Sequence, residues 1–216
     1  MLKQKFTRGL ILLMLFLSMS AFLPVMAQNL IADPGFEAGT PNPSWVESST
    51  NFGTPLCTIG SCGTGLGTGP HTGSWWAWFG GISAYEAGEM SQSLVIPNGT
   101  ANLSFWLEIP VSSGNGSDYL TVEIDGNTIA TFLESTPGYL TYTQVTLDVS
   151  AYADGNSHNV KFYSEIFGPT TTNFFVDDVE LIATQAPPAV PIQPWSILLA
   201  VGLIAGVVFF RFFNIR

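Results

Sequence analysis

The side chains that could do chemistry in this chain of 216 residues are aromatic and acidic, and few are of catalytic type. The only histidines, His71 and His158, lie in turn-like surroundings, and the sequence has no nucleophile elbow, zinc-protease motif or phosphate-binding loop. Carboxylate pairs such as Glu86 and Glu89 occur, but with sixteen carboxylates in the chain such pairs arise by chance. The sequence therefore predicts a protein that is not an enzyme.

A set of aromatic residues at polar positions of alternating strands indicates ligand binding instead. Rings on an outward face can stack on the apolar faces of sugar rings, while neighbouring polar groups such as Glu108 and Lys161 hydrogen-bond to hydroxyl groups. The alternative is that loops cover these rings, or that the rings pack a second apolar layer. The residues predicted to bind a ligand are Trp106, Tyr119, Tyr142, Tyr163 and Gln144.

One acidic residue near the end of the folded part indicates a metal site. In residues 174–181, alternation at period two places Asp177 on the same face as three apolar side chains. Burial of an unpaired carboxylate is costly, and Lys161 is the only Lys or Arg between residues 28 and 186. A bound Ca²⁺ would balance this charge. The alternative is that backbone amides donate hydrogen bonds to Asp177 and no metal is present.

The elements that must position these residues are strands. Apolar and polar residues alternate over several short runs, separated by Asn-Gly and Asp-Gly turn signals, and no run of useful length has helical periodicity. This pattern is typical of an antiparallel β-sandwich. Trp75, Trp76 and Trp78 form a cluster more typical of a core than of a ligand platform. The clearest runs cover residues 101–109, 119–124, 142–149, 160–165 and 174–181.

Residues 38–73 differ from the rest, because they are rich in Gly, Pro, Ser and Thr. A loop of this length is either functional or well pinned. It contains Cys57 and Cys62, the only cysteines, which we expect to form a disulfide in an exported protein. So small a ring contributes about 2 kcal/mol, enough to pin the loop but not to hold the domain together.

The two ends of the chain have the composition of targeting segments. Residues 1–27 have a basic start, an apolar centre and a small-x-small end, which predicts a signal peptide, with an uncleaved anchor as the alternative. Residues 185–194 predict a Pro-rich linker and residues 195–213 a transmembrane or sorting helix. Arginines beside this helix place residues 214–216 in the cytoplasm and the body of the protein outside.

The order of several short motifs resembles a known group of domains. Residues 29–37, Asn-Leu-Ile-Ala-Asp-Pro-Gly-Phe-Glu, resemble the start of CenC-type carbohydrate-binding modules, and residues 73–81 resemble a strand of MAM-like jelly rolls in secreted bacterial proteins. The motif Phe-Val-Asp-Asp-Val at residues 175–179 continues the match. The resemblance implies a jelly-roll domain over residues 28–184, and a structural Ca²⁺ shared by Glu37 and Asp177.

The C-terminal end resembles the PEP-CTERM class of sorting signals, through Val-Pro-Ile-Gln-Pro-Trp at residues 190–195 and the helix that follows. The literal Pro-Glu-Pro is absent. This resemblance implies either processing by a sortase-like enzyme or a permanent membrane anchor.

The charge of the predicted domain excludes one class of partner. Residues 28–186 contain one lysine against sixteen carboxylates, a net charge of −15, so they repel nucleic acid. We therefore expect a non-catalytic cell-surface module that binds carbohydrate or another extracellular matrix polymer. The alternative is an adhesive or structural surface protein that makes protein contacts through the same sandwich.

Overall fold

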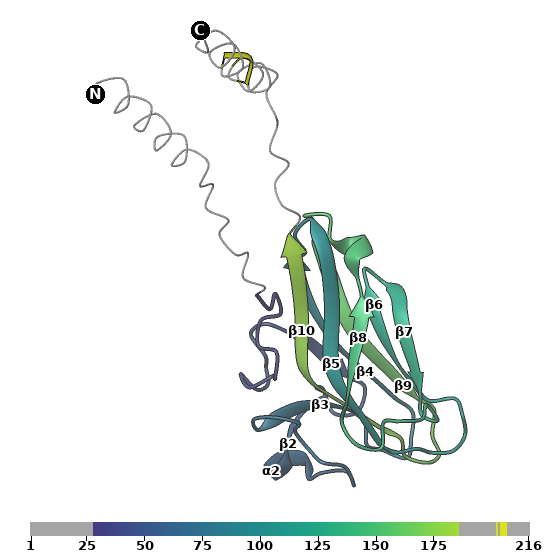
Figure 1. Ribbon diagram of the computed structural model, residues 1–216. Coiled ribbons are helices and arrows are strands. Elements are labelled where there is room, and N and C mark those ends of the chain that lie inside the picture. Colours follow the sequence, from purple (N-terminus) through teal and green to yellow (C-terminus); the bar gives the residue numbers. More distant parts are fainter. Residues whose placement is uncertain (1–27, 186–201, 203, 207–216) are drawn as a thin grey trace, which may run out of the picture. The chain divides into compact units, whose positions relative to one another are not determined.

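The computed structural model describes residues 28–185, 202 and 204–206. Residues 28–185 form two five-stranded antiparallel sheets that pack face to face, so the predicted all-β sandwich is confirmed (Figure 1). Sheet A has the strand order β2-β3-β10-β5-β8, and sheet B has the order β1-β4-β9-β6-β7. Strands adjacent in space are therefore mostly distant in the sequence.

The strands of each sheet differ widely in length. Sheet A consists of β2 (Leu56–Thr58), β3 (Trp75–Gly80), β10 (Asn173–Gln185), β5 (Gly99–Val111) and β8 (Thr143–Asp148). Sheet B consists of β1 (Val46–Ser49), β4 (Glu86–Val95), β9 (Ser157–Ile166), β6 (Tyr119–Ile124) and β7 (Asn127–Leu133). Two short helical turns complete the fold, α2 (Ile59–Cys62) and the 3₁₀ turn η1 (Ser150–Tyr152).

The core lies between the sheets and is formed by every second residue of the long strands. Phe105 of β5 and Phe162 of β9 are fully buried, and their ring centroids lie 5.0 Å apart across the two sheets. Leu120 of β6 belongs to the same core. Full burial of one such side chain contributes about 1.5–3 kcal/mol to the free energy of folding. The apolar side chains that the alternation identifies therefore supply most of the hydrophobic driving force for folding.

A β-bulge in β10 changes which residues share a face. Asp178 has a φ of +47°, and the register between β10 and β5 shifts between Asp177 and Glu180. Because the extra residue reverses the alternation, Val179 faces the core while Asp177 faces the outside of sheet A. The prediction that one face carries Asp177 together with Val179 is therefore wrong, although Asp177 is fully buried as expected.

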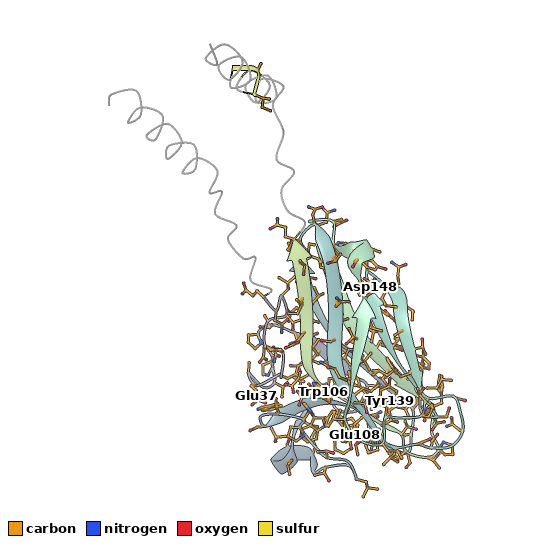
Figure 2. All side chains as sticks on the ribbon, in the orientation of Figure 1. Glu37, Trp106, Glu108, Tyr139 and Asp148 are labelled. Atoms are coloured by element: carbon orange, nitrogen blue, oxygen red, sulfur yellow. A yellow bond between two sulfur atoms is a disulfide. The ribbon has the colours of Figure 1, made fainter. Side chains whose placement is uncertain are left out.

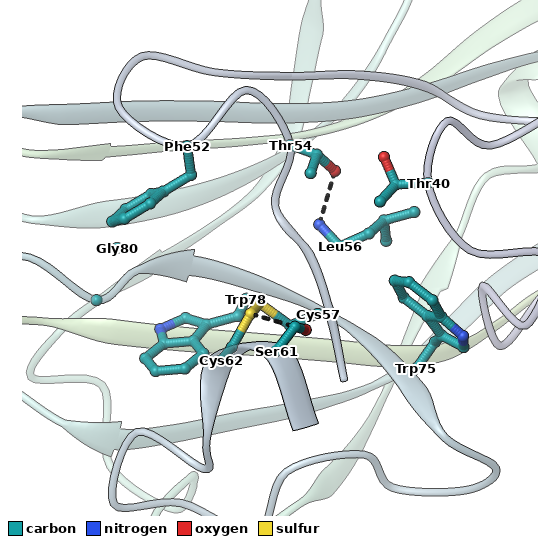
Figure 3. A pocket seen from close by; sticks show the side chains of 11 residues that line it. Thr40, Phe52, Thr54, Leu56, Cys57, Ser61, Cys62, Trp75, Trp78 and Gly80 are labelled. Atoms are coloured by element: carbon teal, nitrogen blue, oxygen red, sulfur yellow. Dashed lines mark hydrogen bonds between the residues drawn. A yellow bond between two sulfur atoms is a disulfide. The ribbon is translucent and has the colours of Figure 1, made fainter. Parts of the chain in front are cut away.

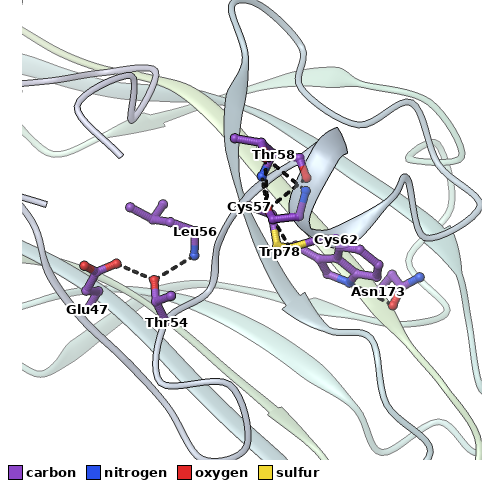
Figure 4. Close-up of a disulfide and its surroundings, with 9 residues drawn as sticks. Glu47, Thr54, Leu56, Cys57, Thr58, Cys62, Trp78 and Asn173 are labelled. Atoms are coloured by element: carbon purple, nitrogen blue, oxygen red, sulfur yellow. Dashed lines mark hydrogen bonds between the residues drawn. A yellow bond between two sulfur atoms is a disulfide. The ribbon is translucent and has the colours of Figure 1, made fainter. Parts of the chain in front are cut away.

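Residues 38–73 are more ordered than their composition suggests. They contain β1, β2 and α2, which the sequence analysis did not predict, and Cys57 and Cys62 form the predicted disulfide (Figure 4). Thr58 caps α2 by accepting a hydrogen bond from the Ser61 amide. The chain then continues as residues 63–73, which we call the strap, across the outer face of sheet A.

The predicted signal peptide at residues 1–27 lies outside the described residues, as does most of the predicted segment 185–213. Residues 202 and 204–206 are helical. Within the described part of the chain, no helix is both long and apolar enough to cross a membrane.

Candidate functional site

The outer face of sheet B carries a group of aromatic rings that no segment covers completely. Tyr119 of β6 and Tyr163 of β9 project from it, because the alternate residues of both strands fill the core. Tyr85, before β4, and Phe167, after β9, extend the group and are 48% and 47% exposed. We call this surface, with Glu165 at its centre, the tyrosine face.

The four rings follow one another at similar spacing. The ring centroids of Tyr85 and Phe167 are 6.2 Å apart, those of Phe167 and Tyr119 are 6.3 Å apart, and those of Tyr119 and Tyr163 are 6.4 Å apart. Contacts at this range stabilise aromatic pairs by about 0.5–1.5 kcal/mol beyond the area they bury. The rings are therefore held in place by one another and by the rigid strands β6 and β9.

Glu165 fixes the polar ends of two of these rings. The hydroxyl of Tyr85 donates to Oε1 of Glu165 at 2.7 Å, and the hydroxyl of Tyr119 donates to Oε2. The hydrogen bond to Glu165 raises the pKa of Tyr85 to about 12 and raises that of Tyr119 further. Both hydroxyls thus stay protonated and hold the carboxylate between them.

A charged pair lies at the other end of the same face. Lys161 Nζ is 2.8 Å from Glu123 Oε2 and 5.4 Å from the ring centroid of Tyr163. Glu89 of β4 is paired with Tyr163 across the strands. The face therefore offers aromatic rings beside carboxylates and one ammonium group, which is the mixture that ligand sites for polar molecules with apolar faces require.

The outer face of sheet A also carries aromatic residues, but the strap covers them. Trp76 and Phe175 are fully buried in a second apolar cluster with Cys57, and the indole of Trp78 packs on the same cluster. The strap is fixed to the sheet, since Asn173 Nδ2 donates to the Gly65 carbonyl at 2.7 Å. The prediction that the tryptophans of β3 belong to a core fits this arrangement.

Trp106 lies toward the lower end of β5 in the view of Figure 2, and His71 at the end of the strap contacts it. The His71 ring stacks on Trp106 with centroids 4.1 Å apart and an interplanar angle of 18°. His71 Nδ1 is 2.6 Å from Asp178 Oδ2, and the Tyr142 hydroxyl donates to the Gly69 carbonyl at 2.7 Å. These contacts support the alternative for Trp106 and Tyr142, in which loops cover the rings.

The five residues predicted to bind a ligand therefore do not form one surface. Trp106, Tyr142 and Gln144 belong to sheet A and the segment before β8, whereas Tyr119 and Tyr163 belong to sheet B. Alternation identified which residues face outward but not to which sheet each strand belongs. Alternation does not identify three further members of the tyrosine face. Tyr85 and Phe167 lie just outside strands, and Glu165 occupies a polar position that carries no further signal.

A concave pocket of about 540 Å³ lies beside the disulfide at the β2–β3 edge of sheet A (Figure 3). Phe52 and Trp78 line it. Its volume is sufficient for a small ligand. However, two of its hydroxyl groups, those of Thr40 and Thr54, already donate to Glu47. The pocket thus has few free polar groups that would orient a ligand, and the tyrosine face is the stronger candidate.

The predicted Ca²⁺ ligands can be tested by their surroundings. Glu37 Oε1 accepts hydrogen bonds from the amides of Ser74 and Trp75, at 2.8 and 2.9 Å. Gly73 has a φ of +62°, and a Cβ atom there would lie 2.2 Å from Glu37 Oε1, so a larger residue would be strained and would displace this carboxylate.

Asp177 has an equally constrained position. The amides of His71, Thr72 and Asp178 donate to its carboxylate. Burial, followed by the charge of Asp178, raises the pKa of Asp177 to about 7. No Lys or Arg pairs with it among residues 28–185.

These surroundings fit a hard cation in part. The donors are oxygens and no Lys or Arg balances the buried Asp177 carboxylate, yet the described residues contain no group of three or more His, Cys, Asp or Glu side chains that could hold a metal. Backbone oxygen atoms would have to complete the site.

Solved structures of similar fold include carbohydrate-binding modules. The structure of TmCBM61 in complex with beta-1,4-galactotriose matches 73% of this chain and 99% of its own, with 18% sequence identity and a TM-score of 0.53. This likeness shows a shared β-sandwich fold.

Two further modules are more distant. A family 16 carbohydrate-binding module matches 71% of this chain and 99% of its own at 20% identity and a TM-score of 0.42. The CBM22-1 xylan-binding domain of Xyn10C from Paenibacillus barcinonensis matches 74% of this chain and 97% of its own at 14% identity and a TM-score of 0.43. No family model matches the sequence, and no curated protein matches it either.

Proposed function

We propose that residues 28–184 form a non-catalytic surface module that binds carbohydrate through the tyrosine face. The observation that carries this proposal is the continuous group of four rings around Glu165 on the outer face of sheet B. Rigid aromatic side chains supply contact area at low cost in conformational entropy, and the adjacent carboxylates accept hydrogen bonds from sugar hydroxyls. The fold shared with TmCBM61 supports the same class of ligand.

The function is tested with the purified full chain on a glycan array, followed by titration calorimetry with the best oligosaccharide. Tyr163→Ala and Phe167→Ala should each weaken binding about tenfold, because each removes one stacking ring of the tyrosine face. Leu140→Ala is the matched control, since Leu140 is an exposed apolar residue outside this face.

The Trp106→Ala variant distinguishes the two faces. Binding should persist in this variant, because His71 already stacks on the Trp106 ring. Binding that is lost in Trp106→Ala but kept in Tyr163→Ala would move the site to sheet A. If no glycan binds and cells clump only when the domain is present, the protein is an adhesive surface protein instead.

The proposal includes a structural Ca²⁺ held by the carboxylates of Glu37 and Asp177 together with backbone oxygens. It is supported by the burial of the Asp177 carboxylate without a Lys or Arg partner among residues 28–185 and by the close approach of Glu37 to Gly73. The metal would neutralise these carboxylates and would take no part in ligand binding.

We also propose that the protein is exported through residues 1–27 and held at the membrane by residues 195–213, with the domain outside. This part of the proposal rests on the sequence alone. The intact mass of the mature protein distinguishes a permanent anchor from removal of the C-terminal segment by a sortase-like enzyme.

A further inference from the structure

The tyrosine face already binds one ammonium group, that of Lys161. The group lies 2.8 Å from the Glu123 carboxylate and 5.4 Å from the centre of the Tyr163 ring. A cation beside a carboxylate and within about 6 Å of an aromatic ring is stabilised by both partners. Lys161 is the only Lys or Arg between residues 28 and 186, and its side chain lies on this face. The face thus accommodates an ammonium group between a carboxylate and an aromatic ring.

The same combination recurs on the adjacent part of the face, around Glu165. The rings of Tyr85, Phe167 and Tyr119 surround this carboxylate, and two of them donate hydroxyl hydrogen bonds to it. A carboxylate has about four acceptor positions, so two hydroxyl donors do not exhaust Glu165. Among residues 28–185, no Lys, Arg or His forms an ion pair with it.

The charge of the surroundings favours a cation as the missing partner. Glu89, Glu123 and Glu165 all project from the tyrosine face, against Lys161 alone. The whole domain has a net charge of −15, which attracts cationic polymers over distances set by the ionic strength and repels uronate or sulfate groups.

We infer that the tyrosine face selects amino-sugar polymers with free ammonium groups over neutral glycans, with Glu165 and its three surrounding rings as the ammonium site. This inference rests on the proposed function, because it names the class of carbohydrate that the face binds. The sugar rings contact the aromatic side chains, and an ammonium substituent pairs with Glu165 as Lys161 pairs with Glu123.

The test uses the full chain and two matched probes, a glucosamine hexamer and its fully N-acetylated counterpart, in titration calorimetry at slightly acidic pH. The glucosamine hexamer should bind about tenfold more tightly at low ionic strength. This preference should largely vanish at about 1 M salt, where the Debye length is about 3 Å.

Two variants assign the effect to the site. Glu165→Gln should abolish the preference for the glucosamine hexamer, so that the two hexamers bind this variant with affinities within about twofold of each other. Lys161→Met should increase affinity for the glucosamine hexamer about threefold, because it frees the Glu123 carboxylate and the Tyr163 ring for a second ammonium group. A purely structural role of either residue would change the affinity for both hexamers by a similar factor and would leave the preference between them intact.

The possible outcomes separate the inference from the proposed function. Equal or tighter binding of the N-acetylated hexamer, or binding of another neutral glycan alone, overturns the inference and leaves carbohydrate binding intact. Decreased affinity for the glucosamine hexamer in Lys161→Met also overturns it. If neither hexamer nor any array glycan binds, both the inference and the proposed function are wrong.

Discussion

At the scale of single residues, His158 is held between two carboxylates. Its Nδ1 lies 2.7 Å from Asp125 Oδ2 and its Nε2 lies 3.0 Å from Asp154 Oδ1. Both ring nitrogens can donate at once only when the imidazole is protonated. The hydrogen bond to Asp125, followed by that to Asp154, raises the pKa of His158.

This arrangement predicts a pH-dependent stability. A raised histidine pKa stabilises the fold fully below the unfolded value of about 6.5, and this stability is lost as the pH rises through the folded pKa. At the acidic side, the hydrogen bond from His158 lowers the pKa of Asp154 to about 2. The contribution of Asp154 to the stability of the fold is therefore present above about pH 4 and is lost as the pH falls toward 2.

The measurement is the urea midpoint as a function of pH for the wild type and for His158→Gln. The wild-type midpoint should decline above about pH 6.5, and this decline should disappear in the variant. Parallel curves for the two proteins would show that the ring between the two carboxylates does not titrate with folding.

At the scale of elements, the strap depends on glycines that let its backbone lie against aromatic rings. A Cβ atom at Gly67 would lie 2.5 Å from Cε2 of Phe175 and 2.8 Å from Cγ of Pro110. Such contacts require displacement of the strap or of the rings beneath it. The disulfide anchors the start of the same segment beside Trp78 (Figure 4).

Gly67→Ala should therefore destabilise the domain by about 1–3 kcal/mol, measured by thermal unfolding. It should also increase solvent access to the tryptophans of β3, measured by fluorescence quenching. Gly60→Ala is the matched control, because its nearest atom would be 3.9 Å away and alanine favours the helical turn. Equal melting temperatures for the two variants would show that the strap is not packed against Phe175.

At the scale of the whole molecule, the first described residues and the last strand are joined. The Leu30 amide donates to the Leu181 carbonyl at 2.9 Å, and Asn29 donates to the Val179 carbonyl at 3.2 Å. The proposed Ca²⁺ ligands, Glu37 and Asp177, belong to the same two segments. A bound metal would therefore close the sandwich at the point where the chain begins and ends its fold.

Calcium should raise the melting temperature of the chelator-treated protein by about 5 °C or more when its concentration is about a hundred times its Kd. At that concentration, a ligand that binds only the folded state stabilises it by about 2.7 kcal/mol. Asp177→Asn should abolish this response, while Glu180→Gln, one register position beyond the bulge, should retain it. An unchanged melting temperature in the wild type would remove the metal from the proposal.

The sequence by itself determined strands β5, β6, β8, β9 and β10, most of their core-facing residues and the disulfide. Alternation of apolar side chains is a local property, and the residues it placed inside, such as Phe105 and Phe162, are fully buried. Cys57 and Cys62 are only five residues apart, so their pairing is likewise decided by the local sequence.

Only the tertiary structure decided which outward residues lie together. Tyr85, Tyr119 and Glu165 are far apart in the sequence, and they meet because β9 pairs with both β4 and β6. The pairing of distant strands is set by the packing of the whole core, so no local pattern reveals it. The same reason explains Trp106: its strand position faces outward, but the strap, fixed by long-range contacts, places His71 on its ring.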